Sequence, residues 1–122
     1  MVTVETANYL ALLQRCGEPQ AYGTGETVFR EGDDATCMYL VRSGAVEVQK
    51  DGRTLERVDP GGLFGEMALI DVGSRSADAV MVEGGELVPI EKRRFWFLVQ
   101  ETPYFAQAVM AVMAARLRRE TT

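Results

Sequence analysis

Short apolar segments separated by glycine-containing turns fill the middle of the chain and predict β-strands. Six segments are rich in β-branched and aromatic residues: TVFR, CMYLVR, AVEVQK, RTLERV, ADAVMV and ELVPIE. In AVEVQK, Val46 and Val48 alternate with polar residues, which is the two-residue period of a half-buried strand. Asp51-Gly52 is typical of a tight hairpin turn, because both residues tolerate positive φ. Many short strands at this spacing indicate an antiparallel sandwich or barrel.

The helical period appears at the two ends of the chain. Residues 5–16 place apolar side chains on one helical face, and Gly17 follows as a stop signal. The segment KRRFWFLVQE predicts a short helix near the other end. Thr102 and Pro103 then supply an N-cap and a proline at the first position of a second helix, which runs to about Arg119.

This last helix carries a wide apolar stripe. The stripe consists of Ala106, Met110, Met113 and Leu117, flanked by Phe105, Val109 and Val112. Packing against the barrel is the favoured interpretation for most of it. A lid over a pocket, or a homodimer formed through this helix, remains open as a further role.

Composition limits the chemistry that is available. The chain has 122 residues, 47% of them hydrophobic and 25% charged, which fits one globular domain over residues 1–122. It contains no histidine, so Ser-His-Asp catalysis and a histidine-based metal site are excluded. Cys16 and Cys37 are isolated and are expected to be reduced, small core residues. We therefore expect no catalytic residue, no metal and no cofactor.

Charge and hydropathy also limit the partners. The net charge is −5, and positive residues are scattered apart from Arg116, Arg118 and Arg119, which suit the carbonyl end of a helix. Direct contact with nucleic acid is therefore not expected. The opening MVTVETANYL lacks the features of a secretory signal, and no apolar run approaches the roughly 18 residues of a membrane span. We expect a soluble, cytoplasmic protein without a membrane partner.

One stretch, FGEMALIDVGSRSA (64–77), predicts an anion-binding site. Gly65 allows the backbone to approach a ligand closely, and a helical turn beginning near Glu66 would point free amide groups at an anion. Arg75 follows a polar turn, and its planar fork suits two phosphate oxygens, with the Ser76 hydroxyl beside it. Glu66 would accept a hydrogen bond from a sugar hydroxyl. The alternative is a plain Glu66–Arg75 salt bridge.

The same stretch resembles the phosphate-binding cassette of cyclic nucleotide-binding domains. EGD (31–33), MYLVRSGAVEV (38–48) and RFWFLVQETP (94–103) resemble that family in the same order, so the resemblance extends from about Ala21 to Arg119. It implies a mainly β fold with flanking helices. The expected parts are an N-terminal helix (1–17), an antiparallel β jelly roll (18–91) that contains the cassette and a short phosphate-binding helix, and C-terminal helices (92–119).

The resemblance also assigns roles to individual residues. Glu66 matches the acceptor of the ribose 2′-hydroxyl, and Arg75 matches the phosphate partner. The other ligand-binding positions that it implies are Gly65, Met67, Ala68, Ser76 and Ala77. Two departures stand out: Ser74 replaces a frequent proline, and Asp78 stands where a small hydroxyl residue is usual. A carboxylate near an anionic ligand would weaken binding unless it faces away from the pocket.

Two functions follow. The leading hypothesis is a non-catalytic sensor for cyclic AMP or cyclic GMP, of the bacterial regulator type, which signals through its C-terminal helices to a separate, unknown protein effector. The alternative is a degenerate domain that serves as a protein–protein interaction module without nucleotide. A cupin-type metalloenzyme is rejected because histidine ligands are lacking.

Overall fold

The computed structural model describes the backbone of residues 13–70 and 73–121; within the last helix the side chains of 116–117 and 119–121 are not described. The N-terminal helix expected over residues 1–17 falls almost entirely outside the described residues.

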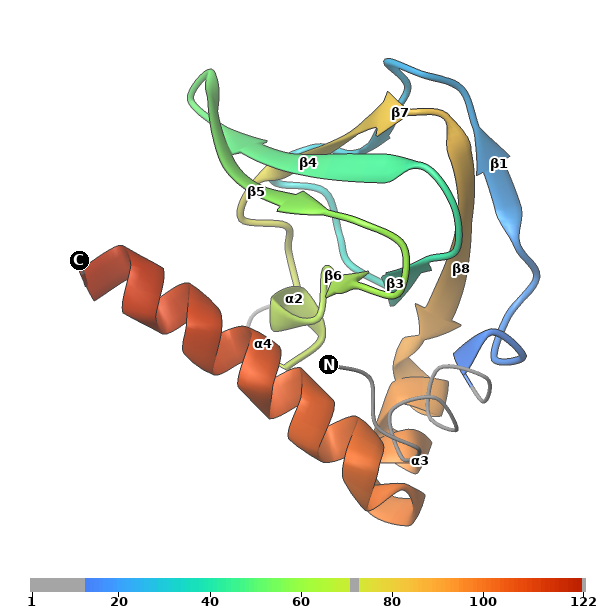
Figure 1. Cartoon of the computed structure of the whole chain (residues 1–122). Helices are drawn as coiled ribbons and strands as arrows, with labels where there is room; N and C mark the ends of the chain where they lie inside the picture. Colours follow the sequence, from blue (N-terminus) through green and yellow to red (C-terminus); the bar gives the residue numbers. More distant parts are fainter. Residues whose placement is uncertain (1–12, 71–72, 122) are drawn as a thin grey trace.

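Eight strands in the described part of the chain form two four-stranded antiparallel sheets that close into a roll (Figure 1). One sheet has the order β1-β8-β3-β6, and the other has the order β2-β7-β4-β5. The strands are β1 (Gln20–Tyr22), β2 (Thr27–Phe29), β3 (Cys37–Val41), β4 (Ala45–Lys50), β5 (Arg53–Val58), β6 (Leu63–Phe64), β7 (Asp78–Glu83) and β8 (Gly85–Glu91). The predicted fold class, an antiparallel jelly roll with flanking helices, is confirmed.

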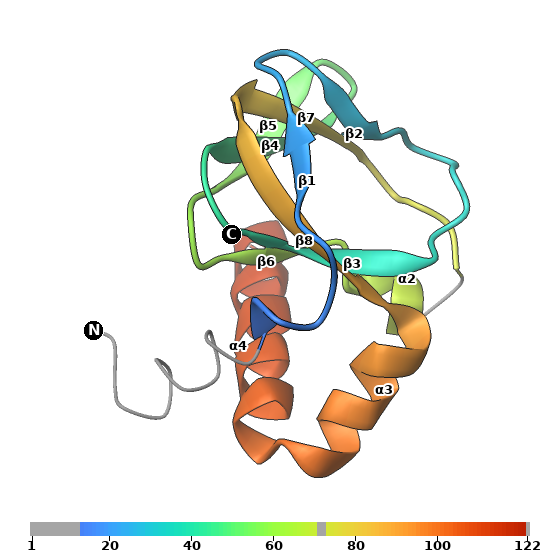
Figure 2. The same cartoon turned by 90° about the vertical axis from the view of Figure 1, so that its right-hand side faces the viewer.

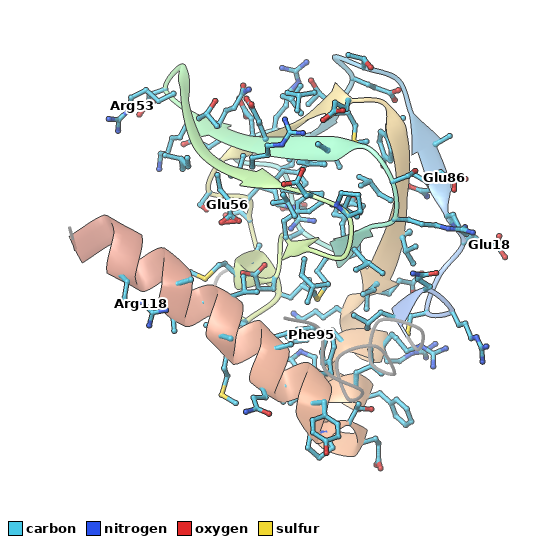
Figure 3. All side chains as sticks on the ribbon, in the orientation of Figure 1. Glu18, Arg53, Glu56, Glu86, Phe95 and Arg118 are labelled. Atoms are coloured by element: carbon cyan, nitrogen blue, oxygen red, sulfur yellow. The ribbon has the colours of Figure 1, made fainter. Side chains whose placement is uncertain are left out.

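All six segments that the apolar pattern marked as strands are strands, whereas β1 and β6 were missed. The hairpin between β4 and β5 is confirmed: Asp51 and Gly52 have φ of 53° and 78°, and Lys50 pairs with Arg53. Positive φ at both turn residues matches the right-handed twist of the two strands. Figure 3 shows Arg53 at the outer end of this hairpin.

Strand β3 separates two hydrophobic clusters, because successive side chains of a strand point to opposite faces. Met38 and Leu40 belong to a cluster shared with the C-terminal helices, while Tyr39 and Val41 belong to the cluster inside the roll. The sheet that contains β3 is therefore a common wall between the helices and the interior of the roll.

Three helices lie within the described residues: α2 (Met67–Ile70), α3 (Lys92–Glu101) and α4 (Pro103–Thr121). Figures 1 and 2 both place α3 and α4 together at one end of the roll. Phe95 of α3, labelled in Figure 3, is buried. Its ring meets the ring of Phe105 of α4 edge-on, with ring centroids 5.6 Å apart. Thr102 is the extended residue between the two helices, as its position before Pro103 predicted.

The apolar stripe of α4 is only partly used for packing. Phe105 and Val109 are buried and Met113 packs against the same cluster, so core packing is confirmed for these positions. Met110, which the sequence pattern placed at the centre of the stripe, is 62% exposed. The prediction was wrong there because the helix is rotated so that Phe105 and Val109, rather than Ala106 and Met110, face the sheet.

Candidate ligand-binding site

The central feature of the site is a buried arginine. Arg75 is only 5% exposed and its guanidinium lies inside the roll. Nη1 donates to the carbonyl oxygen of Gly65 at 2.8 Å, and Nη2 donates to the carbonyl oxygen of Cys37 at 2.5 Å. The guanidinium carbon lies 4.0 Å from the ring centroid of Phe29 and 5.9 Å from that of Tyr39. The Nε–H of Arg75 is buried and has no hydrogen-bond partner among the described residues.

The loop between β2 and β3, which contains the EGD segment (31–33), holds the backbone of Arg75. The Arg75 N–H donates to the carbonyl of Asp33, and the N–H of Gly32 donates to the carbonyl of Arg75, both at 2.8 Å. Ala35 N–H donates to the Gly73 carbonyl at 2.7 Å. Residues 32–35 are therefore hydrogen-bonded to the segment before β7 at Arg75 and at Gly73. The EGD segment thus has a structural role in placing Arg75.

Gly65 is required by the close approach of the arginine. It has φ of +84°, a region that L side chains rarely adopt. A Cβ at this position would lie 2.8 Å from Nη1 of Arg75 and 3.6 Å from the ring of Phe29. The group that approaches the backbone closely at Gly65 is the side chain of Arg75, and the close approach of a ligand stays a prediction.

The turn after Gly65 buries the predicted acidic residue. Glu66 is fully buried and Ala68 is nearly so, whereas the side chain of Met67 is exposed. Helix α2 consists of only four residues. So short a helix has little macrodipole, so the amides of this turn are a weaker source of positive potential than the guanidinium.

The residues after Arg75 leave the site in different directions. Ser76 is exposed and Ala77 is buried. The Asp78 carboxylate accepts a hydrogen bond from the backbone N–H of Glu31 at 2.7 Å. The departure from the usual small hydroxyl residue therefore has a structural explanation, because this carboxylate anchors the loop that holds Arg75.

The electrostatics of the site are those of a buried cation. Burial lowers the pKa of Arg75, and the nearby Cys37, Tyr39 and Asp33 act in the opposite direction. The three ion pairs among the described residues are on the surface and none includes Arg75: they join Arg42 to Glu86, and Arg57 to Asp59 and Glu83. The alternative of a Glu66–Arg75 salt bridge is therefore wrong for the described structure.

Tyr39 shows how strongly this interior excludes water. Burial raises the pKa of the Tyr39 phenol well above its usual value, and Cys37 and Tyr22 raise it further, while Arg75 lowers it. Tyr39 stacks on Phe64 with centroids 5.2 Å apart, and both rings contact Phe29. The guanidinium is thus flanked by an aromatic cluster formed by Phe29, Tyr39 and Phe64.

Sequence reasoning found Gly65, Glu66 and Arg75 but missed three of the groups that hold the arginine. They are the ring of Phe29, the carbonyl of Cys37 and the Gly32–Asp33 backbone. The only signal for Phe29 was its place in the strand segment TVFR, which does not indicate an arginine partner. The expectation that both cysteines are core residues was wrong in degree, because Cys16 and Cys37, neither of which is in a disulfide, are only half-buried.

The described residues contain no group of three or more Cys, Asp or Glu placed to hold a metal ion. No helix in the described ranges is both long and apolar enough to span a membrane.

The fold and this site are those of a known family. The model of the cyclic nucleotide-binding domain matches residues 19–102, more than half of the chain. The chain therefore belongs to the cyclic nucleotide-binding domain family, as the sequence resemblance predicted.

Individual relatives agree with this assignment. The chain is 40% identical over 102 residues to the cyclic AMP receptor protein of Thermus thermophilus, a match that covers 80% of this chain and 47% of that protein. It is 36% identical over 72 residues to a cAMP-dependent protein kinase regulatory subunit of Yarrowia lipolytica, covering 59% of this chain and 19% of that protein. The relatives thus include regulators, although the domain is also matched within an enzyme, a lysophospholipase of Neurospora crassa.

Solved structures show the same fold. The catabolite activator protein of Thermus thermophilus superposes with a TM-score of 0.80 at 34% identity, covering 98% of this chain and 57% of that one. The regulatory domain of Toxoplasma gondii PKA with cAMP gives a TM-score of 0.62 at 30% identity, covering 76% of this chain and 36% of that one. The chain spans about half the length of the bacterial regulators that it matches.

Proposed function

We propose that this chain is a non-catalytic sensor that binds a cyclic nucleotide, cAMP or cGMP, and transmits its occupancy through α3 and α4 to a separate protein. The observation that carries the proposal is the buried guanidinium of Arg75, which has no ion-pair partner among the described residues and an Nε–H without an acceptor. Burying an unpaired cation is costly. A bound phosphodiester would supply the missing anion and accept the free N–H group.

The remaining family residues fit a ligand that extends from this anion. Glu66 would accept from the ribose 2′-hydroxyl, and the Gly65–Ala68 backbone would line the phosphate. Ser76 and Ala77 would complete the ligand-binding positions. Relatives with solved structures support this ligand class: one protein, the EAL enzyme Bd1971, has a cAMP-bound and a cGMP-bound form. In this proposal the nucleotide is a ligand, and no cofactor takes part.

The common wall of the roll gives a physical route from ligand to helices. β3 directs Tyr39 toward the site and Met38 and Leu40 toward α3 and α4. Leu69 of α2 lies in the helix-side cluster with Phe95 and Phe105, although it follows Glu66 by only three residues. If α2 can take two positions, a ligand that binds more tightly to the chain in one of them favours that position. The packing of α3 and α4 against Leu69 would then change with ligand binding.

A second copy of this chain is the first partner that we propose, through α4. A groove of about 450 Å³ lies between α4 and the segment from β5 to β6, with apolar walls that include Leu63, Val112 and Ala115. Glu56, Arg57 and Asp59 also line the groove, and Arg57 forms an ion pair with Asp59. In this proposal the apolar walls of the groove on one copy face those on a second copy. Light scattering should give the mass of a dimer for the parent and of a monomer for Ala115→Glu; a monomeric parent would reject this partner.

The competing function is an interaction module without nucleotide. It is favoured by the two Nη groups of Arg75, which already have carbonyl acceptors, and by exposed aromatic side chains such as Trp96, Phe97 and Tyr104 on α3 and α4. A cytoplasmic location and the absence of direct contact with nucleic acid stay predictions under either function.

Calorimetric titration of the purified chain with cAMP and with cGMP separates the two functions. We expect at least one nucleotide to bind, and Arg75→Ala to lose roughly 30-fold or more in affinity, about 2 kcal/mol, because a charge-assisted contact is removed. Arg42→Ala is the matched control, since Arg42 is an exposed arginine whose partner is Glu86. No heat with either nucleotide, or a variant at position 75 that binds like the parent, would establish the interaction module instead.

A further inference from the structure

The guanidinium of Arg75 is held by some of its donors and leaves one edge unused. An arginine side chain has five N–H donors in a plane, and the Nε–H and one Nη N–H form a parallel pair on one edge. Nη1 and Nη2 each donate to a carbonyl, of Gly65 and of Cys37, while Nε has no acceptor among the described residues. Each Nη group also keeps a second N–H, so the guanidinium retains the Nε–H and two Nη donors beyond those that the carbonyls use.

The guanidinium of Arg75 lies over the ring of Phe29. The guanidinium carbon lies 4.0 Å from the ring centroid, which is the distance of a close cation–π contact. The ring is itself fixed, because its centroid lies 6.1 Å from that of Tyr39 and 6.0 Å from that of Phe64. A cation stacked on a fixed ring and tied at two nitrogens has little freedom to turn.

The backbone of β2 is irregular at this residue. Thr27 pairs with Val80 of β7 and Phe29 pairs with the adjacent Ala79, so Val28 is an extra residue on β2. Such a bulge changes the direction of the side chains around it, and bulges are enriched next to functional sites. The bulge therefore gives an independent reason to connect the direction of the Phe29 ring with the site.

We propose that Phe29 is a positioning residue, whose ring, together with the carbonyls of Gly65 and Cys37, presents the Nε edge of Arg75 to two oxygens of the ligand phosphate. The proposal rests on the proposed function for the identity of the ligand. Beyond the proposed function, it states which edge of the Arg75 guanidinium binds the phosphate. It also assigns a role to Phe29, a residue without a polar group for the ligand.

The first test measures affinity in variants of Phe29. Phe29→Leu keeps an apolar side chain but removes the ring, and we expect its affinity for cAMP or cGMP to fall by about 5- to 30-fold. Phe29→Tyr keeps the ring face and is expected to bind within about twofold of the parent. Equal affinity for Phe29→Leu and the parent, or an equal loss in Phe29→Tyr, would overturn the positioning role.

The second test observes the N–H group itself by NMR of the ¹⁵N-labelled chain. The Arg75 Nε–H signal is assigned by its disappearance in Arg75→Lys. Without nucleotide, we expect faster exchange of this proton with water in Phe29→Leu than in the parent and in Phe29→Tyr. An unchanged exchange rate in Phe29→Leu would contradict the positioning role even for a parent that binds no nucleotide, so the two proposals fail separately.

The same signal reports which edge binds. Saturation of the parent with the nucleotide that it binds should shift the Arg75 Nε–H resonance downfield and slow its exchange. This measurement needs no substitution at Phe29, so it tests the assignment of the edge even if Phe29→Leu does not fold. An Nε–H signal that stays in place at saturation would overturn the assignment of this edge to the ligand.

Discussion

Arg75 and Gly65 are in direct contact: Nη1 of the guanidinium donates to the Gly65 carbonyl at 2.8 Å, and a Cβ on residue 65 would lie 2.8 Å from the same nitrogen. Glycine at position 65 is thus needed for the contact with Arg75 as well as for the turn. Because it has no Cβ, the guanidinium can lie directly against the backbone.

Gly65→Ala should therefore have two effects. The positive φ of +84° costs an alanine about 1 kcal/mol, and the clash with Nη1 displaces the guanidinium at further cost, for a total of about 2–3 kcal/mol. Gly25→Ala is the control, since Gly25 has φ of +89° and a Cβ there would meet nothing within 4 Å. Urea denaturation should show the larger loss at position 65. Equal losses in the two variants would show that contact with Arg75 contributes nothing.

Asp78 is predicted to act on the loop rather than on the ligand. Asp78→Ala removes the acceptor of the Glu31 N–H and should lower the free energy of unfolding by about 1–2 kcal/mol. Asp78→Asn keeps an acceptor oxygen and should lose less. Because the carboxylate is directed at Glu31, the nucleotide affinity of Asp78→Asn should change by less than about threefold. A large gain in affinity would show that the carboxylate opposes the ligand.

The two faces of α4 should respond differently to truncation. Phe105 is fully buried against Phe95, so Phe105→Ala is expected to cost about 3–5 kcal/mol of stability. Met110 is 62% exposed, so Met110→Ala should change the stability of the monomer by less than about 0.5 kcal/mol. Chemical denaturation at low protein concentration makes the comparison. A similar loss at both positions would show that α4 packs with the face that the sequence pattern suggested.

Stability should fall at alkaline pH because of Tyr39. Burial, reinforced by Cys37 and Tyr22, raises the pKa of its phenol in the folded chain above the unfolded value of about 10. The neutral phenol is thus favoured by folding, so its contribution is complete below about pH 10 and is lost as the pH rises above that value. Denaturation between about pH 9 and pH 11 should show a steeper fall for the parent than for Tyr39→Phe. Equal slopes would contradict a buried, neutral Tyr39.

Local signals in the sequence predicted much of the fold. The Asp51-Gly52 turn, the six recognised strands and the break at Thr102-Pro103 each depend on residues that are neighbours in the chain. Strands β1 and β6 were missed because three and two residues are too few to display a period of two, whereas β2, also of three residues, was recognised by the β-branched and aromatic residues of TVFR. The error at Met110 has a related cause: an apolar helix shows several acceptable faces, and contact with the sheet selects one.

The site was predicted only in part, and for a physical reason. Gly65, Glu66 and Arg75 lie in one short stretch with a distinctive pattern, so they were recognised. Phe29 and the Cys37 carbonyl lie far from Arg75 in sequence, 38 residues in the case of Cys37. A backbone carbonyl has no sequence signature, and a ring in a strand has many possible neighbours.

The amino-acid sequence by itself determined the antiparallel strands, the tight hairpin, the C-terminal helices and the presence of an arginine and a glutamate in a glycine-rich turn. These depend on periodicity, turn chemistry and residue type, which are local properties. Only the tertiary structure decided that Arg75 is buried, that it forms no ion pair with Glu66 and that its Nε–H has no acceptor among the described residues. Those facts arise when closure of the roll brings Phe29, Cys37 and Gly65 around one guanidinium and excludes water from it.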